Sequence, residues 1–187
     1  MKLATATIIF IGIANLAWAD QPTFKGVPLG AKQAVFLKAF KDFKCEPPEF
    51  KRDPKIVCNS HKETYGERPV DKVTAEFLQG KLALVQVMKA SQNIEESESY
   101  YAHWKKQLSL KFGLPSKKEN EFSYDGVTLI STEWEMESGG VTLQRAYPAI
   151  GASSREIVAS VWIGSIDYNQ KNFDRLKQKT ASKTKDM

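Results

Sequence analysis

Cys45 and Cys58 are the only cysteines of the chain and the first residues whose spacing restricts their chemistry. Such a pair could form a structural disulfide, a redox pair or part of a metal site. Redox pairs usually have C-x-x-C spacing, and a structural metal site takes four ligands. We therefore expect a structural bridge between Cys45 and Cys58, which would stabilise the fold by about 3 kcal/mol in the chain-entropy model.

The residues that could serve catalysis are few. His61 and His103 are the only histidines, and neither has a second histidine at metal-binding spacing. The chain has no G-x-S-x-G elbow, P-loop or G-x-G-x-x-G motif, and its S-x-x-K match, Ser182 to Lys185, falls in a lysine-rich end. We expect no catalytic residue, no metal and no cofactor, although a hydrolase with a dispersed Ser-His-Asp site stays open.

Three carboxylates alternate along one predicted strand, at Glu133, Glu135 and Glu137. Paired carboxylates can act as acid and base, but such pairs normally come from separate elements with differently tuned environments. The residues between them, Thr132, Trp134 and Met136, suit the opposite face of the same strand. We therefore interpret the glutamates as a solvated face.

The first nineteen residues have the pattern of an export signal. Lys2 precedes an apolar run, Leu3–Leu16, and Ala17–Ala19 gives a small-x-small cleavage site before Asp20. A retained membrane anchor is the alternative, but the run is short and lacks a basic flank. We expect cleavage after Ala19 and a periplasmic or secreted protein, without a lipid anchor because no cysteine lies at the cut.

The formal net charge of the chain is only +5. Charged residues make up 26% of the sequence, and both signs are present. It lacks the basic stripe of a nucleic-acid-binding protein, so nucleic acid is not expected as a partner. Length and composition predict a single domain over residues 20–178 and a disordered basic tail over residues 179–187. That tail could contact anionic lipid headgroups.

A hairpin over Val70–Met88 is the clearest structural signal, because Gln79-Gly80 suits a type I′ turn. Counting from that turn places three apolar side chains on one face, which we assign to the core: Phe77, Leu82 and Leu84. The opposite face would carry Thr74 and Glu76. A hairpin alone is marginal in water, so other elements must cover its apolar face.

Two helices and further strands surround this hairpin. Helical spacing over residues 29–43 places Phe36, Phe40 and Phe43 on one face. A second helix is expected to begin at Asn93, with Glu96 as its capping-box partner, and to stop at Gly113. Strands are predicted over residues 55–65, 122–137, 141–147 and 156–164, with a short helix over residues 167–178.

These elements predict an α+β fold made of two αβββ-like units, about 26–90 and 91–166, as in an internal duplication. The units would form one antiparallel sheet with both main helices on one face. The other face would be partly open and would present Thr74, Glu76, Gln144 and Trp162. Tryptophan is frequent among binding hot spots, so Trp162 is the candidate anchor. The alternative is that Trp162 packs under the C-terminal tail or a loop.

Three short motifs carry a family resemblance: Gly26–Gly30 before the first helix, Phe77–Leu82 in the hairpin and Lys111–Pro115 closing the second helix. With the signal segment, they resemble small periplasmic proteins of Gram-negative bacteria with the β-lactamase-inhibitor-protein or outer-membrane-assembly-lipoprotein architecture. The chain departs from that pattern in lacking a lipid-attachment cysteine and in having three strands per unit. The resemblance implies protein binding or inhibition, or an accessory role in the envelope.

The sequence thus favours an exported, non-enzymatic module that binds another protein of the cell envelope through an open sheet face. A structural or assembly factor of the envelope is the first alternative, and a hydrolase with an unrecognised site is the second. The sequence does not identify the partner or the oligomeric state.

Overall fold

The computed structural model describes residues 21–46, 55–124, 127–148 and 156–165. Within these residues there are two helices, α1 (Gln33–Ala39) and α2 (Ile94–Phe112). The main strands are β3 (Lys44–Glu46), β4 (Lys55–Ser60), β7 (Lys72–Leu78), β8 (Lys81–Ser91), β9 (Lys117–Tyr124), β10 (Val127–Met136), β11 (Gly139–Pro148) and β12 (Ile157–Ser165). Two small hairpins pair β1 (Thr23–Phe24) with β2 (Val27–Pro28), and β5 (Thr64–Tyr65) with β6 (Arg68–Pro69).

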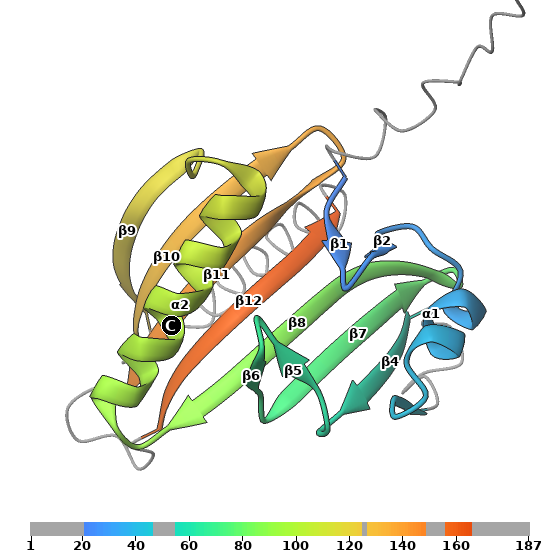
Figure 1. Cartoon of the computed structure of the whole chain (residues 1–187), viewed down its shortest axis with the longest axis horizontal. Helices are drawn as coiled ribbons and strands as arrows, with labels where there is room; N and C mark the ends of the chain where they lie inside the picture. The colour runs from blue at the N-terminus through green and yellow to red at the C-terminus, as the bar shows by residue number, and fades with distance from the viewer. Residues whose placement is uncertain (1–20, 47–54, 125–126, 149–155, 166–187) are drawn as a thin grey trace, which may run out of the picture.

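The eight main strands form one antiparallel sheet in the order β3-β4-β7-β8-β12-β11-β10-β9, with both helices on one side of it (Figure 1). The predicted α+β class and antiparallel sheet are confirmed. Neither helix in the described part of the chain is long and apolar enough to cross a bilayer. The predicted signal segment, the helix at residues 167–178 and the basic tail all lie outside the described residues.

The sheet consists of two halves with the same order of elements. α1 is followed by the meander β3, β4, β7 and β8, and α2 is followed by the meander β9, β10, β11 and β12. The halves join where β8 pairs with β12, with Val87 opposite Val161. Each half therefore has four strands, and the predicted count of three was wrong. The edge strands β3 and β9 were missed because their exposed residues lack an apolar alternation. A common origin of the halves stays a prediction.

The predicted hairpin is present, but the sheet face assigned to one of its buried residues was wrong. Gln79 and Gly80 have φ of 51° and 74°, as a type I′ turn requires. Phe77 pairs with Leu82 as expected, yet Glu76 pairs with Leu84, because the register shifts between Glu76 and Phe77. A β-bulge of this kind moves the following residues to the other face. Leu84 therefore lies on the Glu76 face, where it is 1% exposed.

α2 has the boundaries that its capping residues predict. The Asn93 side chain accepts a hydrogen bond from the Glu95 amide at 2.8 Å, and Gly113 ends the helix with φ of 81°. The Glu96 carboxylate accepts instead from the Ser91 hydroxyl at 2.6 Å, so its expected role in a capping box is replaced by this contact. The buried face of the helix carries Ser97, Tyr100, Tyr101, Trp104 and Leu108.

α1 is seven residues long, much shorter than the predicted helix over residues 29–43. It begins after Gly30, which has φ of 79°, and ends at Phe40, whose φ of −126° and ψ of 87° are not helical. The predicted core role of the phenylalanines is confirmed for Phe36 and Phe43, which are 0% and 7% exposed. Phe36 contacts Phe77 of the sheet with ring centroids 5.4 Å apart.

The β5–β6 hairpin belongs to the first half of the chain but packs on α2 of the second. Trp104 donates from its indole to the Tyr65 carbonyl at 3.2 Å, and Tyr100 donates to the Pro69 carbonyl at 3.0 Å. The rings of Tyr65 and Trp104 meet edge to face at 5.8 Å. This hairpin therefore joins the two halves on the helix side of the sheet.

Candidate functional site

The residues predicted to form an open recognition face do share one face of the sheet. Thr74 pairs with Gln86, which in turn pairs with Trp162. Gln144 pairs with Ser160 on the next strand, two residues from Trp162. Glu76 lies two residues from Thr74 on β7 and therefore on the same side.

These side chains are more covered than an open face would make them. Thr74 is 8% exposed, and its hydroxyl donates to Asn59 at 2.8 Å. Glu76 forms an ion pair with Lys55 at 3.4 Å. Trp162 is half-buried beside Ala83 and Leu84, and its indole donates to Ser160 at 2.9 Å. A partner could reach Trp162 only in part and Thr74 hardly at all.

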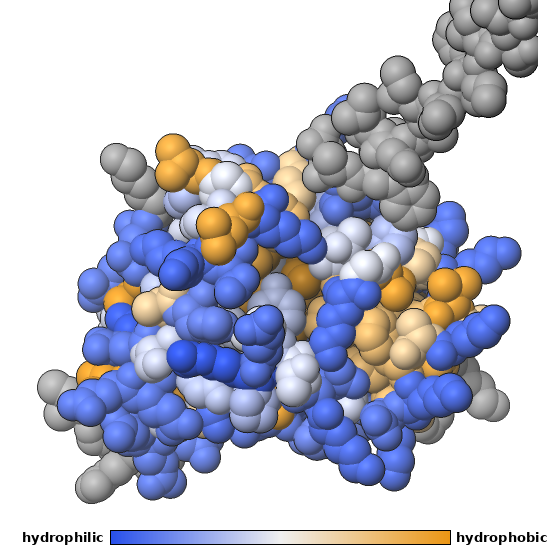
Figure 2. Space-filling model, viewed as in Figure 1, coloured by the Kyte–Doolittle hydropathy of each residue, from blue (hydrophilic) through white to orange (hydrophobic). Residues whose placement is uncertain are grey.

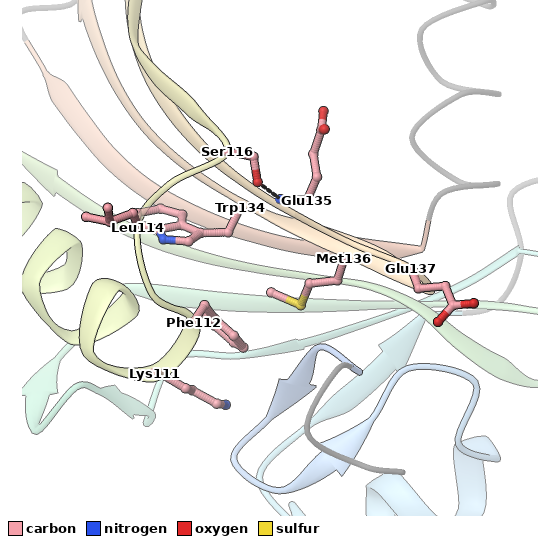
Figure 3. Close-up of a pocket in the computed structure, with 8 residues that line it drawn as sticks. All are labelled: Lys111, Phe112, Leu114, Ser116, Trp134, Glu135, Met136 and Glu137. Atoms are coloured by element: carbon pink, nitrogen blue, oxygen red, sulfur yellow. Dashed lines mark hydrogen bonds between the residues drawn. The ribbon is translucent and has the colours of Figure 1, made fainter. Parts of the chain in front are cut away.

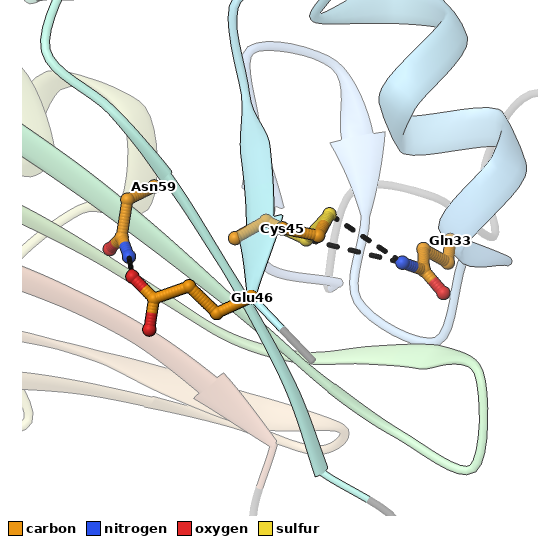
Figure 4. Close-up of a disulfide and its surroundings, with 5 residues drawn as sticks. Gln33, Cys45, Glu46 and Asn59 are labelled. Carbon is orange, nitrogen blue, oxygen red and sulfur yellow. Dashed lines mark hydrogen bonds between the residues drawn. A yellow bond between two sulfur atoms is a disulfide. The ribbon is translucent and has the colours of Figure 1, made fainter. Parts of the chain in front are cut away.

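Cys45 and Cys58 form the predicted disulfide. Cys45 belongs to β3 and lies directly across from Cys58 on β4, so the bridge joins two neighbouring strands. The Gln33 amide of α1 lies 3.6 Å from the Cys45 sulfur (Figure 4). Beside the bridge, Asn59 donates to Glu46 at 3.3 Å (Figure 4). The bridge thus fastens the short edge strand to its neighbour.

Both histidines contact backbone carbonyl groups. His61 lies 2.7 Å from the Asp71 carbonyl oxygen through Nδ1, and His103 lies 2.6 Å from the Gly66 carbonyl oxygen through Nε2. The second contact holds the β5–β6 hairpin on α2. Among the described residues, no group of three or more His, Cys, Asp or Glu side chains is arranged to hold a metal ion.

Two of the three glutamates of β10 and its turn share one lysine partner. Glu133 and Glu135 both bind Lys117, at 3.0 Å and 2.7 Å, and these carboxylates raise the pKa of that lysine. The intervening residues Thr132 and Trp134 are 0% and 2% exposed, as the solvated-face interpretation expects.

A cleft of about 430 Å³ lies between the end of α2 and the β10–β11 hairpin (Figure 3). We call it the α2 cleft. Its lining residues are Lys111, Phe112, Leu114, Ser116, Trp134, Glu135, Met136 and Glu137. Neither histidine is among them, so the cleft does not bring together the groups that the hydrolase alternative needs.

The lining of the α2 cleft combines apolar side chains with polar and charged ones. Phe112 and Met136 point toward each other across it, and Trp134 lies beside Leu114 (Figure 3). The Trp134 indole donates to the Gly113 carbonyl at 3.1 Å, which fixes the segment after α2 against the sheet. Ser116 accepts from the Glu135 amide at 2.8 Å and closes this end of the segment.

Lys111 and Glu137 flank the cleft on opposite sides (Figure 3). The Lys111 ammonium donates to the Thr23 hydroxyl at 3.0 Å and lies 4.9 Å from the centre of the Phe112 ring. Partial burial lowers the pKa of Lys111. The cleft thus offers a cation at one side, a carboxylate at the other and apolar side chains between them.

Two leucines at this end of α2 are exposed. Leu110 is 73% exposed and Leu114, on the rim of the cleft, is 91% exposed. Figure 2 shows apolar residues over this end of α2, at the upper left of the view. Sequence reasoning interpreted Leu114 only as part of a helix stop. The sequence signal that could have indicated this surface was Leu110, an apolar residue that falls outside the buried stripe of the helix.

Comparison of the chain with protein-family models, with curated proteins and with solved structures finds no match. The resemblance to periplasmic inhibitor and assembly proteins therefore stays a prediction about architecture.

Proposed function

We propose that this chain is an exported, non-enzymatic module that binds another protein through the α2 cleft. The observation that carries the proposal is the exposure of Leu114, 91%, on the rim of a cleft floored by Trp134 and Met136. Exposed apolar patches mark interaction sites, and Leu110, which is 73% exposed, adds to Leu114 at this end of α2.

The chemistry of the cleft indicates the kind of segment that it binds. An apolar side chain of the partner fills the space between Phe112 and Met136. An acidic group of the partner lies toward Lys111, and a basic group lies toward Glu137. A short segment with an apolar anchor between opposite charges satisfies all three contacts, as in groove recognition of peptides.

Export of the module is supported by the signal pattern of residues 1–19 and by the Cys45–Cys58 bridge, since disulfides persist in oxidising compartments. The sheet face around Trp162 contributes less to partner binding in this proposal than the α2 cleft does, because Thr74 and Ser160 on that face are only 8% and 6% exposed.

The test is affinity capture from a periplasmic extract with the tagged chain beginning at Asp20. We expect one dominant partner, lost from the Leu110→Ser/Leu114→Ser variant and retained by Ile94→Ser. Ile94 is a matched control because it is 50% exposed at the other end of the same helix. Equal capture by both variants would contradict a role for the cleft.

A further inference from the structure

The surface around α1 combines exposed lysines with exposed apolar side chains. Figure 2 shows apolar residues gathered over α1, at the right of the view, with hydrophilic residues around them. Val35 is 55% exposed, and Ala34 and Ala39 are exposed beside it. The exposed lysines of this surface, which we call the α1 face, are Lys32, Lys38 and Lys41.

The positive charge of the α1 face is local. Residues 25–46 contain five lysines and two acidic residues, whereas α2 contains three of each. None of these three exposed lysines forms an ion pair with another described residue. Of the two acids, Glu46 accepts a hydrogen bond from Asn59. The lysines are therefore available to an anionic partner.

The α1 face is held firmly on the sheet. The Gly30 amide donates to the Leu82 carbonyl at 2.7 Å, and the Leu82 amide donates to the Ala31 carbonyl at 2.8 Å. On its inner side, Phe36 packs on Phe40 and Phe43, with ring centroids 4.7 Å and 5.0 Å apart. The outer side chains of the helix are thus presented by a fixed base rather than by a loose segment.

We propose that the α1 face binds the surface of an anionic phospholipid bilayer. A short helix with lysines around small apolar side chains suits the interface of a bilayer, where ammonium groups meet lipid phosphates and apolar groups enter the headgroup boundary. Because the exposed apolar area is small, electrostatic attraction supplies most of the binding, and added salt weakens it. This contact leaves the α2 cleft free and does not depend on the proposed function.

The test is co-sedimentation of the chain from Asp20 to Met187 with vesicles of phosphatidylglycerol and phosphatidylethanolamine, beside vesicles of phosphatidylcholine. We expect binding to the anionic vesicles at low salt, with little binding at high salt or to phosphatidylcholine. Replacing Lys38 and Lys41 by glutamine should weaken the partition about tenfold or more, since each lysine near the surface contributes strongly.

The matched control replaces Lys62 and Lys106 by glutamine, which removes the same charge from exposed positions off the α1 face. Its binding should change less than about twofold if location rather than total charge matters. A second variant, Val35→Asp, should also release the chain from vesicles. Circular dichroism of all variants should match that of the parent, because the replaced side chains are exposed.

Several results would overturn the proposal. Equal binding to phosphatidylcholine would do so, as would equal weakening by the two lysine pairs. Loss of binding on removal of residues 179–187, with no effect of the Lys38 and Lys41 changes, would assign the contact to the basic tail instead. Retention on immobilised polyglutamate without vesicle binding would point to an acidic protein as the partner.

Discussion

The two halves of the sheet follow the same path with different means of support. The first half has a seven-residue helix, a three-residue edge strand fastened by a disulfide, and an inserted hairpin. The second half has a nineteen-residue capped helix and an eight-residue edge strand whose Lys117 binds two glutamates. The long helix α2 packs on β8, β11 and β12, across the junction of the halves. The short helix α1 rests on a cluster of aromatic rings, and a disulfide closes the edge of its half.

The two halves also differ in the kind of surface that we propose for binding. α1 leaves a lysine-rich face beside the aromatic cluster of the first half. α2 ends at Gly113 beside the β10–β11 hairpin, and the space between them is the α2 cleft. If the two halves arose from one unit, the divergence of α1 and α2 produced the different contact surface that we propose for each half.

Trp104 tests whether the halves depend on each other. It is 0% exposed and contacts the hairpin of the first half from the helix of the second. Trp104→Ala should lower the free energy of unfolding by about 3–5 kcal/mol, because it leaves a large cavity and an unpaired carbonyl. Urea denaturation measures this loss, and the half-buried Trp162→Ala is the control with a smaller effect. A loss below about 1 kcal/mol would mean that the halves are supported separately.

The disulfide should limit local opening of the first half more than that of the second. Replacing Cys45 and Cys58 together by alanine should lower the free energy of unfolding by about 3 kcal/mol through the larger entropy of the unfolded chain. Hydrogen exchange should rise in β3 and β4 before β9 and β10. Equal acceleration at both edges of the sheet would contradict the contrast between the halves.

Two tyrosines, one from each half, should make stability fall in alkali. Burial raises the pKa of Tyr101 to about 12, and the pKa of Tyr65 to about 12 as well. An unfolded tyrosine titrates near pH 10, so above that pH the unfolded chain loses protons that the folded chain keeps. Stability is therefore complete below about pH 10 and declines as pH rises toward 12, by about 2 kcal/mol for each group.

Tyr101→Phe and Tyr65→Phe separate these contributions. Each should reduce the alkaline decline by a similar amount when denaturation midpoints are compared across pH. At neutral pH, Tyr101→Phe should cost more than Tyr65→Phe, because Tyr101 shares a hydrogen bond of 2.9 Å with the Thr132 hydroxyl. An unchanged decline in the double variant would show that other groups control alkaline stability.

Substitutions at the helix caps should have the smallest effect on stability, and they compare the two helices most directly. Asn93→Ala removes the side-chain cap of α2 and should destabilise the chain by about 1 kcal/mol. Lys32, at the equivalent position of α1, has extended backbone angles but makes no side-chain cap. Lys32→Asn should therefore stabilise by up to about 1 kcal/mol. Thermal denaturation measures both, and effects of the same sign would refute the contrast.

The sequence predicted those features that depend on neighbouring residues. Gln79-Gly80 predicts its turn, and Asn93 with Gly113 predicts the ends of α2, because each acts on the backbone within a few positions. The side of the sheet that Leu84 takes was not predictable by alternation, since one bulge reverses the faces. The edge strands were missed because exposed strands need no apolar pattern.

The α2 cleft could not be found in the sequence for a different reason. Phe112 and Leu114 come from the end of a helix, and Trp134 and Met136 come from a strand about twenty positions later. Only the pairing of β10 with β9 and β11 brings these segments together. The disulfide, by contrast, needed no tertiary information beyond two cysteines and a predicted export signal.

The most direct test of the central claim places a photo-crosslinking amino acid at Leu114 in cells that make the protein. The α2 cleft predicts one discrete crosslinked species from position 114, and none from the same group at Ile94 on the far end of α2. The same crosslinked species from both positions, or a discrete species from Ile94 alone, would contradict binding at the cleft.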